Sequence, residues 1–371
     1  MKICFLTTGD IKDIATAKRA LGMANPLSDL GYQVYILLQN SDENRKRVAM
    51  ECDSRVTVHF FSKERTLAEI LAKNTFLNQI RPDFLYLCGF VIRNIPFFYL
   101  KKTIILTEHS ELQSGISDVK GMKRVFTLLL EYFSIIKSDG LLQASKYLQK
   151  EYRRRAKRIG VKRTDFYFPY AFNRDLYKPI EKEKLSESFQ AYSATFNFVF
   201  LGTITKNYGA FTMLEAFQKL TERFDNIKLI LLGKGRHYKE ALEFIKINKL
   251  EDRVHLPGFV EEEDISDYFS IANAFISPMN DTVQDWARCP SKLYMYLPFQ
   301  KPIISCKIGE TFETLQEQGY YFSPGNKDSL ADVMALIRES QHLFSFTHFE
   351  LHSWQTRTLE FHKWIEQTFQ Q

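Results

Sequence analysis

The sequence lacks the patterns that mark several common classes of protein. Its 371 residues include only five cysteines, whose scattered spacing fits free thiols in a reducing compartment and suggests no zinc site. Among its eight histidines only His348 and His352 have HxxxH spacing and none has HxH spacing, and we predict no metal site. No apolar run reaches the roughly 18–20 residues of a spanning helix, since residues 125–136 are interrupted by Thr127 and Glu131. The opening residues MKICFL are too short for a signal peptide, so we expect a protein that is soluble or at most peripheral to a membrane.

Two further absences argue against particular functions. No GxGxxG pattern occurs in either half of the chain, which disfavours a dinucleotide site and a hydride-transferring dehydrogenase. The net charge of +6 is mild, and we expect no nucleic-acid partner.

The sequence does contain a regular alternation of strand and helix patterns. In the first half it predicts strands at 2–6, 32–38, 56–61, 84–88 and 103–106, with helices at 15–30 and 67–80. In the second half it predicts strands at 196–202, 228–232 and 274–278, with helices at 211–224, 238–248 and 265–272. This order is typical of an α/β fold with doubly wound parallel sheets, and the length favours two domains.

The most informative stretch is residues 286–307, WARCPSKLYMYLPFQKPIISCK, which reads as a loop, a helix and a strand. Arg288, Ser291 and Lys292 stand at the start of that helix. Unpaired N–H groups and a partial positive charge make a helix start favourable for an anion, and the two cations would add full charges. The alternative interpretation is a solvated basic turn on a buried helix.

These residues carry a resemblance to a known family. Pro290-Ser291-Lys292-Leu293, with Tyr296-Leu297 and Lys301-Pro302-Ile303-Ile304, resembles the PSKLxEYLAxGKPVV segment of "group 1" nucleotide-sugar glycosyltransferases of the GT-B fold. The resemblance implies two Rossmann-like lobes facing a central cleft. It implies a hexosyltransferase-type enzyme that moves a sugar from a nucleotide diphosphate sugar to a hydroxyl acceptor on a glycan or lipid carrier.

The same resemblance implies a setting and a mechanism. The family retains the anomeric configuration and uses neither a metal nor a cofactor beyond the donor. We expect a role in cell-surface polysaccharide or glycolipid synthesis, in the cytoplasm or at the inner face of a membrane.

The pattern also suggests a domain plan. We expect an acceptor-binding lobe at 1–178, a polar linker at 179–195, a donor lobe at 196–353, and a helix at 354–371 that crosses back to the first lobe.

By resemblance, the second lobe holds the donor. The diphosphate is assigned to Arg288, Lys292, Ser291, Lys206 and Gly202, and the vicinity of the base and sugar to Gly258, Phe259 and Asp285.

Three positions depart from the family pattern. Thr203 stands where the family has an arginine, Tyr208 where it has a lysine, and Met295 where it has an acid that binds the donor's ribose. These departures remove side chains that usually bind the donor, and Arg288 is the cation that we expect to compensate. They indicate either altered donor binding or lost activity.

The first lobe offers candidate catalytic residues after the strand at 103–106. In the family a histidine there lines the sugar site, and the resemblance assigns this role to His109. Glu108 and Glu111 could orient His109 or accept a proton from the acceptor hydroxyl, so we take His109 and Glu111 as the catalytic candidates. The alternative is a loop histidine that is hydrogen-bonded to Glu111.

Residues 146–163 are strongly basic. Nine cations face a single acid, Glu151. The cations are Lys146, Lys150, Arg153, Arg154, Arg155, Lys157, Arg158, Lys162 and Arg163. A basic helix with one apolar face can lie on an anionic membrane, and a solvated helix face is the alternative.

Two other functions stay open. The departures at Thr203, Tyr208 and Met295 would suit a binding protein of the same fold that has lost catalysis. A nucleotide-sugar epimerase of the same fold would need converging carboxylates, for which Asp10, Glu108 and Glu111 are the candidates.

Overall fold

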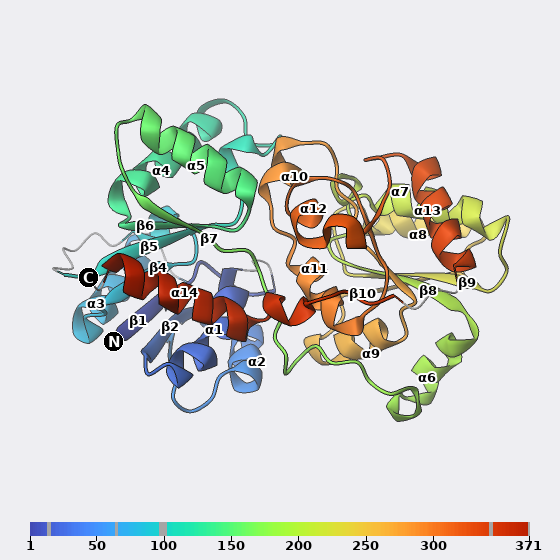
Figure 1. Cartoon of the computed structure of the whole chain (residues 1–371), viewed down its shortest axis with the longest axis horizontal. Helices are drawn as coiled ribbons and strands as arrows, with labels where there is room; N and C mark the ends of the chain where they lie inside the picture. The colour runs from blue at the N-terminus through green and yellow to red at the C-terminus, as the bar shows by residue number, and fades with distance from the viewer. Residues whose placement is uncertain (13–15, 64–65, 96–101, 341–343, 370–371) are drawn as a thin grey trace. The chain divides into compact units, whose positions relative to one another are not determined.

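The computed structural model describes residues 1–12, 16–63, 66–95, 102–340 and 344–369. The chain forms two compact units (Figure 1). Unit 1 consists of Met1–Ala171, Ala287–Cys289 and Leu351–Gln371. Unit 2 consists of Phe172–Trp286 and Pro290–Glu350.

Unit 1 is built on a seven-stranded parallel sheet in the order β3-β2-β1-β4-β5-β6-β7. Its strands are β1 Lys2–Leu6, β2 Gln33–Gln39, β3 Thr57–Phe61, β4 Phe84–Leu87, β5 Ile104–His109, β6 Gly140–Gln143 and β7 Thr164–Tyr167. Its helices are α1 Thr16–Asp29, α2 Asp42–Glu51, α3 Thr66–Ile80, α4 Gly121–Lys137, α5 Lys146–Arg158 and α14 Trp354–Phe369.

Unit 2 is built on a six-stranded parallel sheet in the order β10-β9-β8-β11-β12-β13. Its strands are β8 Phe196–Leu201, β9 Ile227–Leu232, β10 Val254–Gly258, β11 Ala274–Ile276, β12 Ile303–Ser305 and β13 Tyr320–Tyr321. Its helices are α6 Glu187–Gln190, α7 Ala210–Thr221, α8 Tyr238–Ile247, α9 Ile265–Ser270, α10 Val283–Ala287, α11 Ser291–Tyr296, α12 Gly309–Leu315 and α13 Lys327–Glu339.

The apolar runs explain why these strands are central. β1 reads KICFL and β9 reads IKLILL, and their side chains are almost all buried. Strands of a parallel sheet are covered on both faces, so they read as continuous apolar runs rather than as alternating patterns. The predicted fold class, Rossmann-like α/β with two parallel sheets, is confirmed.

Several boundaries differ from the prediction. β5 continues to His109, past the predicted end at residue 106, because its polar residues find partners on segments outside the sheet. The Thr107 hydroxyl meets that of Ser138 at 2.5 Å, and Glu108 pairs with Arg19. The helix expected at 15–30 is α1, and Ala15 lies outside the described residues. Within residues 179–195 the chain forms short helical segments, among them α6.

α1 and α14 pack together in unit 1 at a glycine (Figure 1). A Cβ atom placed on Gly22 would lie 2.2 Å from Cδ1 of Trp354. The Arg19 guanidinium, one turn earlier on α1, lies 4.5 Å from the ring centre of Phe168 and 5.5 Å from that of Trp354. Its Nε atom is 3.1 Å from Glu108 Oε2, and both side chains are buried. Glycine at position 22 therefore allows the close contact between the two helices.

This contact predicts whether one substitution raises or lowers the free energy of unfolding. In an open helix interior, alanine is more stable than glycine by roughly 0.5–1 kcal/mol. At position 22 we expect the opposite. Gly22→Ala should lower the free energy of unfolding by about 1–3 kcal/mol, because Trp354 must move. Urea unfolding measures the change. Trp354→Leu should make room, so the double variant should lose less than the sum of the single losses. A Gly22→Ala protein as stable as wild type would contradict this packing.

Candidate functional site

The candidate site of unit 2 lies at the carboxyl edge of its sheet. All six strands are parallel, so their following loops emerge at one edge. β8 and β11 are neighbours, and the strand order runs outward from them in both directions. This point is where open α/β sheets bind their ligands.

Glycines allow the loops at this edge to pack backbone against backbone. A Cβ on Gly233 would lie 2.1 Å from the carbonyl oxygen of Gly202, and one on Gly235 would lie 2.4 Å from that of Ile204. The Gly202 N–H donates to Leu232 O (2.8 Å). Gly202 was predicted to bind the diphosphate. Because its N–H already donates to Leu232, Gly202 leaves room for a ligand and offers it no hydrogen bond from that N–H.

Lys292 is the predicted cation that the structure brings to this edge. Its Nζ atom lies 3.9 Å from the ring centre of Phe200 on β8, in a cation–π contact. A Cβ atom on Gly202 would lie 3.3 Å from the same Nζ. α11 is held beside β8 because the Leu201 N–H donates to the Tyr296 hydroxyl (2.9 Å). Ser291 begins α11, one residue before Lys292.

Lys206 takes a different direction. Its Nζ atom forms an ion pair with Glu240 of α8 at 2.8 Å and lies 5.3 Å from the ring centre of Phe211. Both charged side chains are about half exposed. The structure therefore does not bring Lys206 to Lys292.

Gly258 ends β10 at the same edge, and Phe259 follows it. Gly258 has a φ of +89°, and a Cβ there would lie 2.8 Å from Lys234 Cε. Phe259 is 40% exposed. Lys234, which sequence analysis did not select, is thus a second cation at the strand ends, and the signal for it was the Gly-Lys-Gly sequence after β9.

Asp285 is placed inside its own loop. Its side chain is buried, and its Oδ2 accepts from the Asn280 N–H (2.6 Å). The Thr282 hydroxyl accepts from the Asp285 N–H (3.2 Å). A Cβ on Gly309 would lie 3.0 Å from the Asp285 carbonyl oxygen, so the start of α12 rests on this loop. The described contacts of Asp285 thus shape the loop.

The missing ribose-binding acid has no replacement on α11, where Met295 is buried. A buried acid does lie nearby in sequence at Glu310 on α12. The Tyr294 hydroxyl is 3.3 Å from Glu310 Oε1 and 3.0 Å from the Thr314 hydroxyl. These contacts link α11 with α12, and sequence analysis did not foresee them.

Arg288 belongs to the segment Ala287–Cys289 of unit 1. The Ser145 hydroxyl donates to the Ala287 carbonyl (2.6 Å), and the Tyr170 N–H meets Cys289 Sγ at 3.4 Å. Arg288 itself is 7% exposed. The role predicted for it, binding the diphosphate together with Lys292, stays a prediction.

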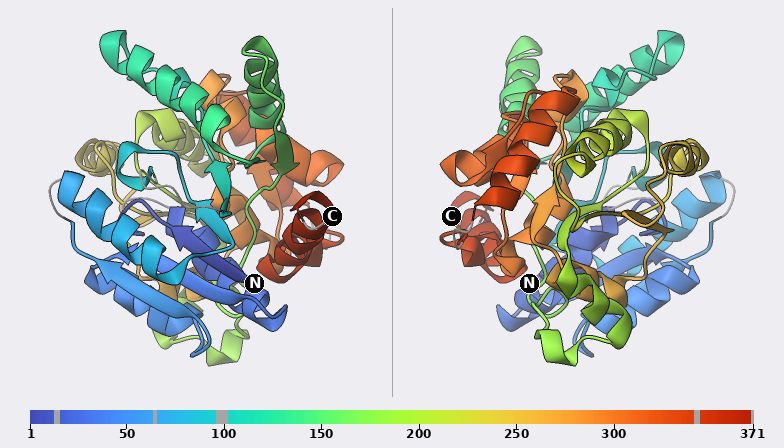
Figure 2. Two further views of the ribbon diagram at one scale, coloured as in Figure 1. Left: turned by 90° about the vertical axis from the view of Figure 1, so that its left-hand side faces the viewer. Right: turned by 90° about the vertical axis from the view of Figure 1, so that its right-hand side faces the viewer.

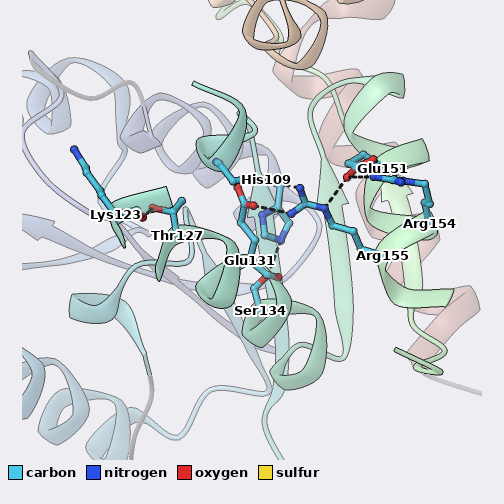
Figure 3. A network of polar contacts seen from close by, with 9 residues as sticks. His109, Lys123, Thr127, Glu131, Ser134, Glu151, Arg154 and Arg155 are labelled. Carbon is cyan, nitrogen blue, oxygen red and sulfur yellow. Dashed lines mark hydrogen bonds and ion pairs between the residues drawn. The ribbon is translucent and has the colours of Figure 1, made fainter. Parts of the chain in front are cut away.

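His109 lies at the end of β5, inside unit 1 (Figure 3). Its ring stacks on Tyr152 with centres 3.9 Å apart, and its Nε2 is 3.2 Å from the Ser134 hydroxyl. Ser134 donates its hydrogen to the Glu131 carbonyl, so it accepts from His109, which therefore carries its proton on Nε2. Burial, and then the charge of Arg155, lower the pKa of His109 to about 3, so the ring is neutral at physiological pH.

Beside His109 lies a buried ion-pair network that joins α4 to α5 (Figure 3). Arg155 of α5 binds Glu131 of α4 at 2.6 Å and Glu151 at 2.7 Å. The other Glu131 oxygen accepts from the Ser114 N–H (3.0 Å). Glu111, the second catalytic candidate, accepts from Gln113 (3.1 Å). The described partners of His109 are thus Ser134 and Tyr152, rather than Glu111 as the alternative interpretation had it.

A hollow in unit 2, about 340 Å³ in volume, is not part of this site. It is lined by Leu185, Phe189, Asn197, Asn273 and Lys301, among others. Asn197 is near the start of β8, and Asn273 precedes β11. The hollow therefore lies at the amino edge of the sheet, away from Lys292.

Within the described ranges, no group of three or more His, Cys, Asp and Glu side chains could hold a metal ion. None of the helices described there is long and apolar enough to cross a membrane.

The buried His109 predicts a pH dependence of stability. At pH above about 6.5 the ring is neutral in both the folded and the unfolded chain, and its contribution is fully present. As pH falls from there towards 3, the unfolded chain binds a proton that the folded chain excludes, at a cost of up to about 1.4 kcal/mol per pH unit. We expect the stability of wild type relative to His109→Phe to shrink over that range in urea unfolding. Parallel pH profiles would contradict the assignment.

Comparisons with known proteins bear on this site. Residues 181–345 match the family model of Glycosyl transferases group 1. An uncharacterized glycosyltransferase of Methanocaldococcus jannaschii is 25% identical over 144 residues. This match covers 38% of this chain and 34% of the archaeal protein, so it spans about a third of that relative's length.

Solved structures resemble the chain over its whole length. Anabaena HepE in complex with UDP and glucose has a TM-score of 0.73 and 16% identity, covering 100% of this chain and 95% of that one. Sucrose-phosphate synthase of Thermosynechococcus elongatus has a TM-score of 0.75 and 14% identity, covering 100% of both chains. At these identities the structures show the fold. Together with the family model, they confirm the resemblance to group 1 glycosyltransferases.

Proposed function

We propose that this chain, whose residues 181–345 match the group 1 glycosyl transferases, moves a sugar from a nucleotide diphosphate sugar to a hydroxyl acceptor. The observation that carries the proposal is the ammonium group of Lys292 beside Gly202 at the carboxyl edge of the unit 2 sheet. HepE, a protein of the same fold, binds UDP and glucose, which supports a nucleotide-sugar donor.

In this reaction, the residues at the carboxyl edge of the unit 2 sheet would stabilise the diphosphate leaving group. As the bond from the sugar's anomeric carbon to the diphosphate oxygen breaks, negative charge grows on the diphosphate. A preorganised cation reduces the cost of that charge. Lys292 is held in place by its contact with the Phe200 ring, so it needs little reorganisation to meet a phosphate. Lys234, at the end of β9, is suited to a second contact.

The finer parts of the proposal rest on the family resemblance. We infer a hexosyl donor, retention of configuration, independence of metal ions, and an acceptor that is a glycan or a lipid-linked compound. We also infer a cytoplasmic enzyme of cell-surface polysaccharide or glycolipid synthesis. The anomeric configuration of the product, read by NMR, tests retention, and activity in excess EDTA tests the independence of metal ions.

Because three donor-binding positions depart from the family pattern, nucleotide binding is the first property to test. Calorimetric titration with UDP, GDP and ADP should show micromolar binding of one nucleotide. We expect Lys292→Met to weaken it by about 10- to 100-fold, because one charge-assisted hydrogen bond of roughly 1.5–3 kcal/mol is lost while the packing on Phe200 is kept.

Lys206→Met is the matched control, since it removes a lysine that pairs with Glu240 instead. We expect it to change the affinity by less than about threefold, because its ammonium group pairs with Glu240 and does not lie beside Lys292. Arg288→Ala tests the predicted second cation in the same titration. Well-folded wild type that binds none of the three nucleotides would overturn the enzyme proposal, and the binding protein without catalysis would become the better interpretation.

A further inference from the structure

The hollow at the amino edge of the unit 2 sheet lies outside the candidate donor site. Its volume of about 340 Å³ is within the range of small-molecule sites, roughly 300–1,000 Å³. One wall is the segment 180–195, which leads into β8, and the other is the turn between α9 and β11. The segment, light green with α6, lies at the lower side of unit 2 in Figure 1 and in the right-hand view of Figure 2. The hollow is thus built within one unit.

Hydrogen bonds hold the two walls of the hollow together. The buried Asn197 donates from Nδ2 to the carbonyl groups of Tyr192 and Ile271, both at 2.9 Å. The Ile180 N–H donates to the hydroxyl of Ser270, the last residue of α9 (2.9 Å). These bonds fix the segment before β8 against the turn before β11. The hollow is therefore formed before a ligand arrives, which lowers the cost of ordering on binding.

Apolar side chains give the hollow its body. Leu185, Phe189 and Tyr192 line it from the segment before β8, and Ile271 lines it from the turn. The Phe189 ring packs edge-to-face on Tyr268, with ring centres 4.8 Å apart. The rings of Phe189 and Tyr192 are neighbours, with centres 6.5 Å apart. Aromatic walls that are fixed by their own packing favour a ligand with a flat apolar body.

The polar groups of the lining add a preference for negative charge. Lys182 and Lys301 both line the hollow, and neither ammonium group has an ion pair or hydrogen bond with another described residue. Asn273 Oδ1 accepts from the Asn197 N–H (2.8 Å), which leaves the Asn273 NH₂ group without an acceptor in the described part of the chain. Of the described residues that line the hollow, none is Asp or Glu. Two cations and an amide donor without an acid favour an anionic group.

From this arrangement we infer that the hollow binds a small amphiphilic anion. Its flat apolar body lies against Phe189 and Tyr192, and its carboxylate or phosphate meets Lys182 and Lys301. This ligand is distinct from the sugar donor, because the hollow is at the amino edge of the sheet and Lys292 is at the carboxyl edge. The inference is independent of the proposed function, since it uses no residue that is assigned to the donor.

Methyl NMR of the full chain, labelled at the isoleucine δ1 positions, tests the inference. Ile180 and Ile271 line the hollow, whereas Ile204 and Ile308 follow β8 and β12 at the carboxyl edge. We expect 2-naphthoate and 2-naphthyl phosphate to shift the first pair of signals, with dissociation constants of roughly 0.1–1 mM for ligands of this size. The tighter of the two identifies the anionic group. Titrations that leave the Ile180 and Ile271 signals unchanged, whether or not the carboxyl-edge signals shift, would overturn the inference.

Two simpler probes test whether both halves of the ligand are needed. Neutral 2-naphthol has the apolar body without the charge, and inorganic phosphate has the charge without the body. Each should bind at least about tenfold more weakly than the complete ligands, because it lacks either the ion pairs or the apolar contact. Inorganic phosphate or 2-naphthol that binds as tightly as the complete ligands would contradict the proposed chemistry.

Lys182→Met with Lys301→Met removes both cations and keeps the length of the side chains. This change should weaken 2-naphthoate by about tenfold and leave the methyl spectrum of the free protein otherwise unchanged. The matched control is Lys178→Met with Lys184→Met, which makes the same change in charge on two exposed lysines outside the hollow, each of which forms an ion pair. It should change the affinity by less than about twofold. Equal losses in the two double variants would indicate attraction by net charge alone and would overturn the inference.

Discussion

The parallel direction of every strand is the constraint on which the rest of the structure depends. A parallel pair needs a long return connection, and helices supply it on both faces of each sheet. The same constraint sends every loop that follows a strand to one edge. Gly202 and Gly233 follow β8 and β9, and Gly258 ends β10, yet the three glycines meet there because these strands are neighbours. The location of the candidate donor site is thus a consequence of strand direction.

Most of the fold could be predicted from the sequence because buried parallel strands leave strong apolar runs. β1, β8 and β9 are of this kind, and their predicted positions agree with the structure to within a residue or two. The predicted strand ended before the end of β5, because Thr107 and Glu108 look like loop residues in the sequence. Their partners, Ser138 and Arg19, are distant in the chain, so local patterns carry no sign that these polar residues would be satisfied inside a sheet.

The candidate site was predicted less well, for a related reason. A motif indicates which backbone approaches a ligand, but a charged side chain is directed by neighbours that the motif does not contain. Lys292 meets Phe200 and stays at the strand ends, while Lys206 meets Glu240 and turns away. The neutral, buried state of His109 likewise depends on Tyr152 and Arg155, more than forty residues later in the chain.

Unit 1 is discontinuous in the chain, because α14 packs on α1 and contributes Trp364 beside Phe166 of the last strand, with ring centres 5.1 Å apart. On a ribosome, the first 171 residues of this unit emerge long before the helix that covers them. Until then the hydrophobic surface under α14 stays open. We therefore expect unit 2, whose strands lie between these two parts, to complete its core before unit 1 does, so that the segment made first is finished last.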